Sequence, residues 1–133
     1  MSGYQAALVL HVIGAVLGVG AVAAVAIVAR AARAGAPGAG GALPGLLRWT
    51  GASLGWMLLT GVALDFSVGG AYHATGWFRG SVVLMLATGA LGGLARRALR
   101  AGDGPRAVVR VERLAYGMCA LVAAIVALME AKP

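Results

Sequence analysis

The sequence has little charge and little capacity for covalent cross-linking. Lys, Arg, Asp and Glu make up 11% of the 133 positions, and only four residues are acidic. Soluble domains carry about 25% charged residues, so this composition argues against a soluble globular protein. The single cysteine, Cys119, excludes an internal disulfide, and its apolar neighbours favour a small buried side chain.

What the sequence does contain is long apolar runs, of which residues 4–29 form the first. As a helix this run would be about 39 Å long, enough to cross a hydrocarbon core of about 30 Å. Its first basic residue, Arg30, comes after the apolar run, whereas a signal peptide has basic residues before a much shorter one. We therefore expect a retained membrane span.

Three further apolar segments predict three more spans, at residues 46–66, 77–99 and 107–129. The connection at residues 30–48 is rich in Gly and Ala and holds two prolines, so we expect a flexible loop there. The other two connections, at 67–76 and 100–106, are short. These segments predict one all-α domain over residues 1–133, an integral membrane four-helix bundle with antiparallel, up-down-up-down order.

The basic residues predict the orientation in the membrane. The first connection carries three arginines and residues 96–113 carry six, which leaves only Arg79 and Lys132 elsewhere. Cytoplasmic loops are enriched in Lys and Arg, so the first and third connections should be cytoplasmic and both termini outside. Because the positive charges gather at the ends of apolar spans, anionic lipid rather than nucleic acid is the expected partner. Abundant Ala, Gly and Arg suggest a bacterial inner-membrane protein.

His11 is the one polar ring inside the first span. On a helix it shares a face with Gly14 and Gly18, a small-residue stripe that lets helices approach closely, so its ring should point into the bundle. Gly51/Gly55 and Gly89/Gly93 repeat the same spacing in two other spans. Three roles remain open for His11: a structural hydrogen bond, ligation of a haem b or a metal, and a proton relay.

The other histidine, His73, lies in the predicted outer loop and is either a second haem ligand or a solvated side chain. Asp65 and Arg79 flank the same loop, which predicts an ion pair at the outer helix ends or a charged pocket mouth. Soft sulfur ligands select Cu(I), so copper binding is a further hypothesis. Its candidate ligands, which are otherwise ordinary core residues, are Met57, Met85, Met118 and Cys119.

Three segments carry a family resemblance: residues 10–21 (LHVIGAVLGVGA), 58–61 (LLTG) and 76–86 (GWFRGSVVLML). The chain resembles small four-helix bacterial membrane proteins of unknown function, which are distantly similar to copper-resistance D-type membrane proteins and to the membrane-embedded protoporphyrinogen oxidase of bacteria. The resemblance implies that His11 is a haem ligand. Gly18 stands where those relatives have tryptophan, and residues 79–81 lack the lysine of the oxidases.

These patterns favour a non-catalytic membrane protein, either free-standing, self-associated or an accessory subunit of a larger membrane complex. A b-type haem protein using His11, with His73 as a second ligand, is the first alternative. Copper handling is the second alternative. The missing lysine argues against oxidase activity, so we do not expect an enzyme.

Overall fold

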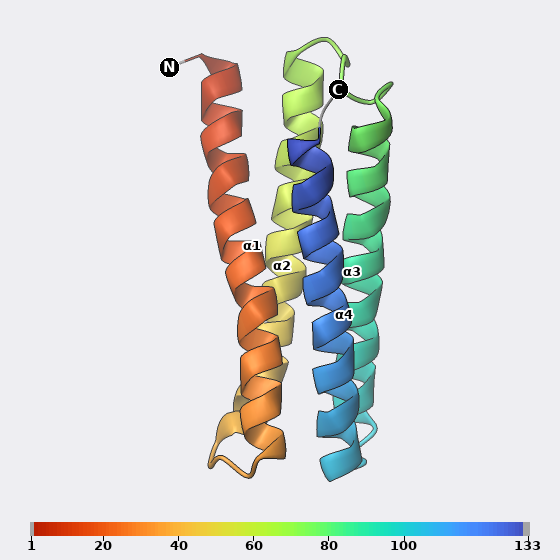
Figure 1. The fold of residues 1–133 in the computed structure, drawn as a ribbon. Helices are drawn as coiled ribbons and strands as arrows, with labels where there is room; N and C mark the ends of the chain where they lie inside the picture. Colours follow the sequence, from red (N-terminus) through yellow and green to blue (C-terminus); the bar gives the residue numbers. More distant parts are fainter. Residues whose placement is uncertain (1, 132–133) are drawn as a thin grey trace.

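Alanine and leucine are abundant in the chain, and both favour helix. The computed structural model describes residues 2–131, and this part consists of four α-helices with no strand. The helices are α1 (Gly3–Arg33), α2 (Ala39–Ser67), α3 (Gly76–Arg100) and α4 (Pro105–Glu130). They lie side by side, with successive connections at opposite ends and with the start of α1 and the end of α4 at the same end (Figure 1).

The first connection differs most from the sequence-based expectation. The predicted flexible loop at residues 30–48 is mostly helical, because α1 continues to Arg33 and α2 begins at Ala39. Alanine has the highest helix propensity, and it fills both flanks of this segment. The turn itself uses Gly35 and Gly38, whose φ angles of 83° and 74° suit glycine. α3 and α4 each begin and end within two residues of their predicted spans.

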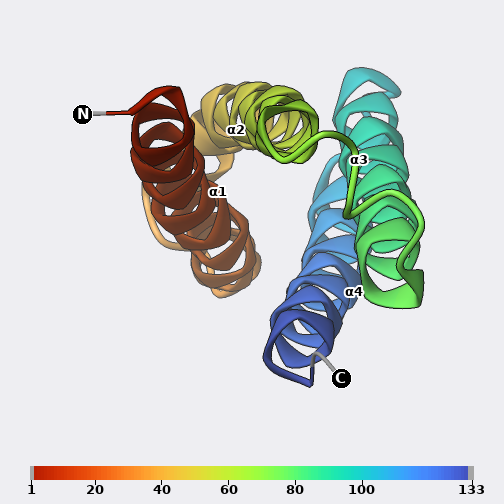
Figure 2. The same cartoon turned by 90° about the horizontal axis from the view of Figure 1, so that it is seen from above.

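The helices are associated as two hairpins, α1 with α2 and α3 with α4, which Figure 2 shows from above. α1 also packs along α4, whereas α2 packs much less against α3. The main buried cluster lies near the first and third connections, where small alanines let the hairpins meet closely. Its members are Val25, Ala26, Ala29, Leu43, Leu47, Ala95, Ala98, Val111 and Ala115. The opposite half has a smaller buried cluster of Leu54, Met57, Met85 and Ile125.

The outer surface of the helices is apolar over much of its length. Large side chains such as Val16, Leu59 and Phe66 are 68%, 70% and 77% exposed. Extended apolar surface of this kind is a sign of a membrane or protein environment. By length and composition, α1, α3 and α4 are each apolar enough to cross a membrane. α2, which the sequence also predicts as a span, is not among them.

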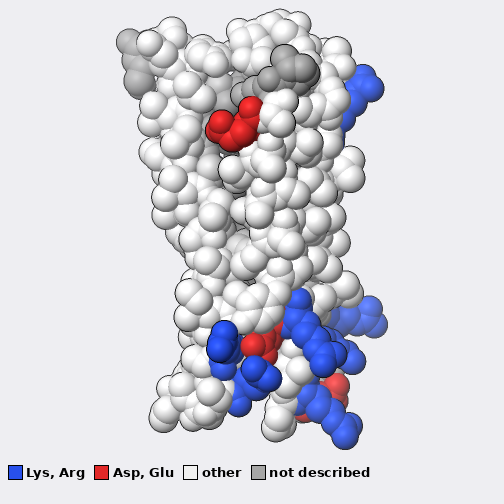
Figure 3. All heavy atoms as spheres, in the orientation of Figure 1, with Lys and Arg blue, Asp and Glu red and all other residues white. Residues whose placement is uncertain are grey.

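Charge is distributed unevenly between the two ends. Lys and Arg side chains gather around the first and third connections (Figure 3). Here Arg33 Nε lies 2.7 Å from Glu112 Oε2, which joins α1 to α4. The Glu112 side chain is only 8% exposed, so this pair is partly shielded from solvent and links the two hairpins. Lys132, which entered the predicted charge asymmetry, lies outside the described residues.

Candidate functional site

His11 points from α1 to α2. Its Nδ1 lies 2.9 Å from Thr60 Oγ1, and the Thr60 hydroxyl donates to the Trp56 carbonyl at 2.9 Å. Because a hydroxyl has one proton to give, the Thr60 oxygen accepts from the imidazole, and Nδ1 carries the proton. Nε2 of the neutral ring then keeps its lone pair for another partner.

The small residues beside His11 also face α2. A methyl group on Gly14 would lie 2.5 Å from Trp56 Cδ1, and one on Gly18 would lie 3.1 Å from Met57 Sδ. Trp56 Nε1 donates to the Leu10 carbonyl at 3.1 Å, which fixes the indole across the helix pair. The predicted stripe is therefore the contact surface of the first hairpin, and it sets the direction in which His11 points.

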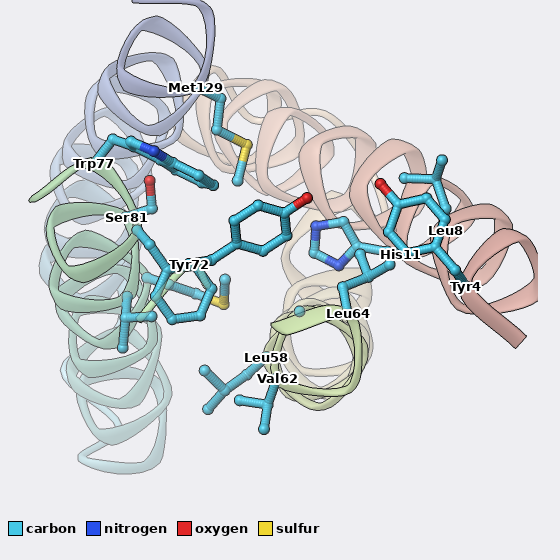
Figure 4. A pocket seen from close by; sticks show the side chains of 14 residues that line it. Tyr4, Leu8, His11, Leu58, Val62, Leu64, Tyr72, Trp77, Ser81 and Met129 are labelled. Atoms are coloured by element: carbon cyan, nitrogen blue, oxygen red, sulfur yellow. The ribbon is translucent and has the colours of Figure 1, made fainter. Parts of the chain in front are cut away.

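In the half of the molecule that holds the second connection, His11 borders a cavity of about 220 Å³ that is lined by residues of all four helices and of that connection. Figure 4 shows the Tyr72 ring reaching into it, with the hydroxyl directed toward the side that carries Tyr4 and His11. Most of its wall is apolar. The residues with polar atoms or sulfur along it are Tyr4, His11, Tyr72, Trp77, Ser81, Met85 and Met129.

Ser81 and Tyr72 each contribute a hydroxyl group to the lining of this cavity. Ser81 is 3% exposed, and its Oγ has no hydrogen-bond partner in the described part of the chain. The Tyr72 hydroxyl is hydrogen-bonded to Tyr4, which raises the pKa of Tyr72, and the nearby Asp65 carboxylate raises it further. Tyr72 thus stays protonated and already has a partner in Tyr4, whereas Ser81 has a donor and an acceptor still to satisfy.

Asp65 organises the second connection, but not through the predicted ion pair. Its Oδ1 accepts the backbone N–H groups of Tyr72 and His73 at 2.8 and 3.1 Å, and its Oδ2 lies 3.2 Å from His73 Nδ1. Arg79 Nε instead donates to the His73 carbonyl at 2.8 Å, and residues 2–131 contain no direct Asp65–Arg79 pair. The loop backbone folds over the end of α2, so its N–H groups reach the carboxylate.

The structure does not bring the two histidines together. His73 is directed at Asp65, its side chain is 66% exposed, and it does not line the cavity that His11 borders. Its ring packs over Gly70, where a Cβ would lie 2.7 Å from Cε1. His73 is therefore a residue of the loop, and it does not face His11 as a second haem ligand would.

The four residues considered for copper are divided between two regions. Met57 and Met85 belong to the buried cluster near His11, with Met129 packed against it. Cys119 packs against the main cluster near the first and third connections, and Met118 lies beside Gly92. No group of three or more His, Cys, Asp or Glu residues suited to a metal occurs within residues 2–131.

Met129 and Ser81 were not among the site residues expected from the sequence. Met129 borders the His11 cavity and also a second apolar hollow of about 220 Å³, shared with His11 and Met85. Met129 is the last residue of the predicted span 107–129, whereas His11 lies about two turns inside the predicted span 4–29, so their sequence positions did not predict a shared cavity. Ser81 carried no signal either, because an isolated serine in a span is common.

Comparison with known proteins finds no matching family model, no matching curated protein and no matching solved structure. The resemblance to small bacterial four-helix membrane proteins therefore stays a hypothesis, and the functional argument rests on the site itself.

Proposed function

We propose that this chain is a multi-pass protein of a bacterial inner membrane, with four spans and both termini outside. Three strongly apolar helices and an apolar exposed surface support the insertion. Basic residues concentrated at one end support the orientation, since positively charged loops stay on the cytoplasmic side.

α2 fits as the fourth span because its polar side chains face inward. Thr50, Ser53 and Thr60 are 1%, 7% and 8% exposed. Thr50 and Thr60 also donate to carbonyls of their own helix, which satisfies their hydroxyl protons without water. Leu59 and Phe66 lie on the exposed side. Lipid would contact this apolar side. The mean hydropathy of α2 includes its buried polar side chains, so it is lower than the hydropathy of the side that lipid would contact.

Within that membrane protein we propose a non-catalytic binding role, either free-standing or as an accessory subunit. The observation that carries it is Ser81, whose buried hydroxyl has no hydrogen-bond partner among residues 2–131 and lines the same cavity as His11. A buried polar group left unsatisfied costs about 1–3 kcal/mol. A lipid-soluble ligand with a carbonyl or hydroxyl group would satisfy Ser81 and bury its apolar part against the cavity wall.

The experiment is mass spectrometry of organic extracts from the purified protein. Wild type should release a lipid-soluble molecule in a fixed ratio to protein. Ser81→Ala, which removes only the hydroxyl, should release markedly less, whereas Ser67→Ala outside the cavity should match wild type. Equal release from Ser81→Ala, or no such molecule from wild type, would contradict the binding role.

A b-type haem protein is the second candidate, and the Thr60 hydrogen bond favours it. Thr60 holds the imidazole in the tautomer whose Nε2 can ligate iron. Met85 and Met129 line the same cavity and could offer thioether sulfur as a second ligand, whereas His73 lies outside it. When bound, haem would supply one-electron redox chemistry, and the chain would supply the oriented imidazole and the apolar enclosure.

Visible spectroscopy with added haemin tests this candidate. Wild type and His73→Ala should both develop a Soret band, and His11→Ala should not. A band of equal strength in His11→Ala, or its absence from wild type, would refute ligation by His11. Titration with Cu(I) under the same conditions tests copper handling, for which His11, Met85 and Met129 are the candidate ligands in this half of the molecule.

A further inference from the structure

At the opposite end from the His11 cavity, three arginines line one groove between α2 and α3. Arg48 comes from α2, and Arg96 and Arg100 come from the last two turns of α3. The groove encloses about 260 Å³, and Pro44 and Leu99 complete its lining. The groove therefore combines three positively charged side chains with an apolar wall.

Within residues 2–131, these three arginines have no anionic partner. The ion pairs in this part of the chain are Arg33–Glu112 and His73–Asp65. Neither involves a groove arginine, and no hydrogen bond from the described residues occupies the three guanidinium groups. Like charges in one groove repel each other, so an anion bound between them would lower the free energy of this region.

The groove also has a defined geometry. Arg96 is half-buried and crosses from α3 to α2, where its Nη1 lies 3.4 Å from the position of a Cβ on Gly51. The glycine at this position gives the guanidinium room against the α2 backbone. Because α2 packs much less against α3 than against α1, the space beside Arg96 stays open.

We propose that this groove binds the phosphate of an anionic phospholipid. Guanidinium groups form paired, charge-assisted hydrogen bonds with phosphate oxygens, and the apolar wall suits the start of an acyl chain. The proposal rests on the membrane orientation given above, which sets these helix ends at the cytoplasmic headgroup level. Trp49, next to Arg48 and 54% exposed, fits that level, where indoles are enriched.

Native mass spectrometry of the full chain in detergent tests the proposal, with phosphatidylglycerol as the probe and phosphatidylcholine as the zwitterionic comparison. Arg96→Gln removes one pair of charge-assisted hydrogen bonds, so it should weaken phosphatidylglycerol binding about tenfold or more. Arg97→Gln is the matched control, since it removes one charge at the same end but lines the neighbouring groove between α3 and α4. It should change binding less than about twofold.

Three results would overturn the proposal. They are equal weakening by Arg96→Gln and Arg97→Gln, equal binding of the two lipids, and displacement of the lipid by millimolar inorganic phosphate, which would mark a free-anion site. Arg100→Gln, at an exposed helix end, gives a second variant should Arg96→Gln lose its helical circular dichroism. The Ser81→Ala extraction experiment concerns the other end of the molecule, so the two proposals fail independently.

Discussion

The Thr60 hydroxyl takes part in two hydrogen bonds, because it donates to its own helix and accepts from His11. We predict that Thr60→Val destabilises the protein by about 1–3 kcal/mol, since the half-buried imidazole N–H loses its acceptor. The measurement is denaturant unfolding in mixed micelles. Thr88→Val is the control, because Thr88 donates only to the Leu84 carbonyl of its own helix and should cost much less. Equal losses would mean that the His11 contact contributes nothing.

The pKa of Tyr72 tests the contact between Tyr72 and Tyr4 at the cavity. Its hydrogen bond with Tyr4 raises its pKa above the ordinary value of 10.0, so Tyr4→Phe should lower the pKa of Tyr72. A group whose pKa is raised by folding stabilises the fold below its unfolded pKa, so this contribution is present up to about pH 10 and is lost as the pH rises through the folded value.

Ultraviolet difference titration of phenolate absorbance measures the Tyr72 effect. Tyr116→Phe removes a phenol that is 48% exposed on α4 and should leave the pKa of Tyr72 unchanged. An unchanged Tyr72 midpoint in Tyr4→Phe would show that the two hydroxyls do not interact.

At the scale of elements, the α1–α2 hairpin depends on the absence of a side chain at Gly14. A methyl group there would meet the Trp56 ring, which is held by its hydrogen bond to Leu10. We predict that Gly14→Ala destabilises the protein by about 1–3 kcal/mol, as overpacking does.

Gly20 is the matched control for this prediction, because nothing lies within 4 Å of a Cβ at that position in the same helix. Gly20→Ala should be neutral or stabilising by up to about 1 kcal/mol, since alanine favours helix. Thermal unfolding in one detergent compares the two variants. A Gly14→Ala protein as stable as Gly20→Ala would mean that Trp56 moves away freely.

For the whole molecule, the charge asymmetry predicts an orientation that labelling can check. In a Cys119→Ala background, a cysteine at position 2 or 73 should react with a membrane-impermeant reagent added outside intact cells. A cysteine at position 38, in the first connection, should react only after the membrane is opened. The opposite pattern would reverse the topology, and it would also move the arginine groove to the outer headgroup level.

The presence of four helices and the ends of α3 and α4 are the features that the sequence alone predicted well. α3 and α4 follow the expected spans closely, because hydropathy and helix propensity are properties of neighbouring residues. The early start of α2 was missed because prolines and glycines in residues 30–48 suggested a loop. Pro44 is nevertheless accommodated in the second turn of α2, where only one helical hydrogen bond is lost.

The candidate site shows the limit of that local information. The stripe of Gly14 and Gly18 predicted that His11 faces another helix, because both lie on its face of α1. The identity of its partner, Thr60, depends on how α1 and α2 are rotated against each other across 49 positions of sequence. Likewise, the pairing of Asp65 with Arg79 was the simplest reading of two charges near one loop, but the folded loop places His73 between them.

The apolar segments, the four helices and the basic end follow from the sequence alone, because each depends on residues that are close together in the chain. Helix packing is what places Ser81 and Met129 on one cavity with His11, leaves His73 outside it, and joins Arg48 to Arg96 and Arg100 in one groove. These groupings depend on the relative rotation and spacing of helices distant in sequence, which side-chain packing sets and hydropathy does not encode.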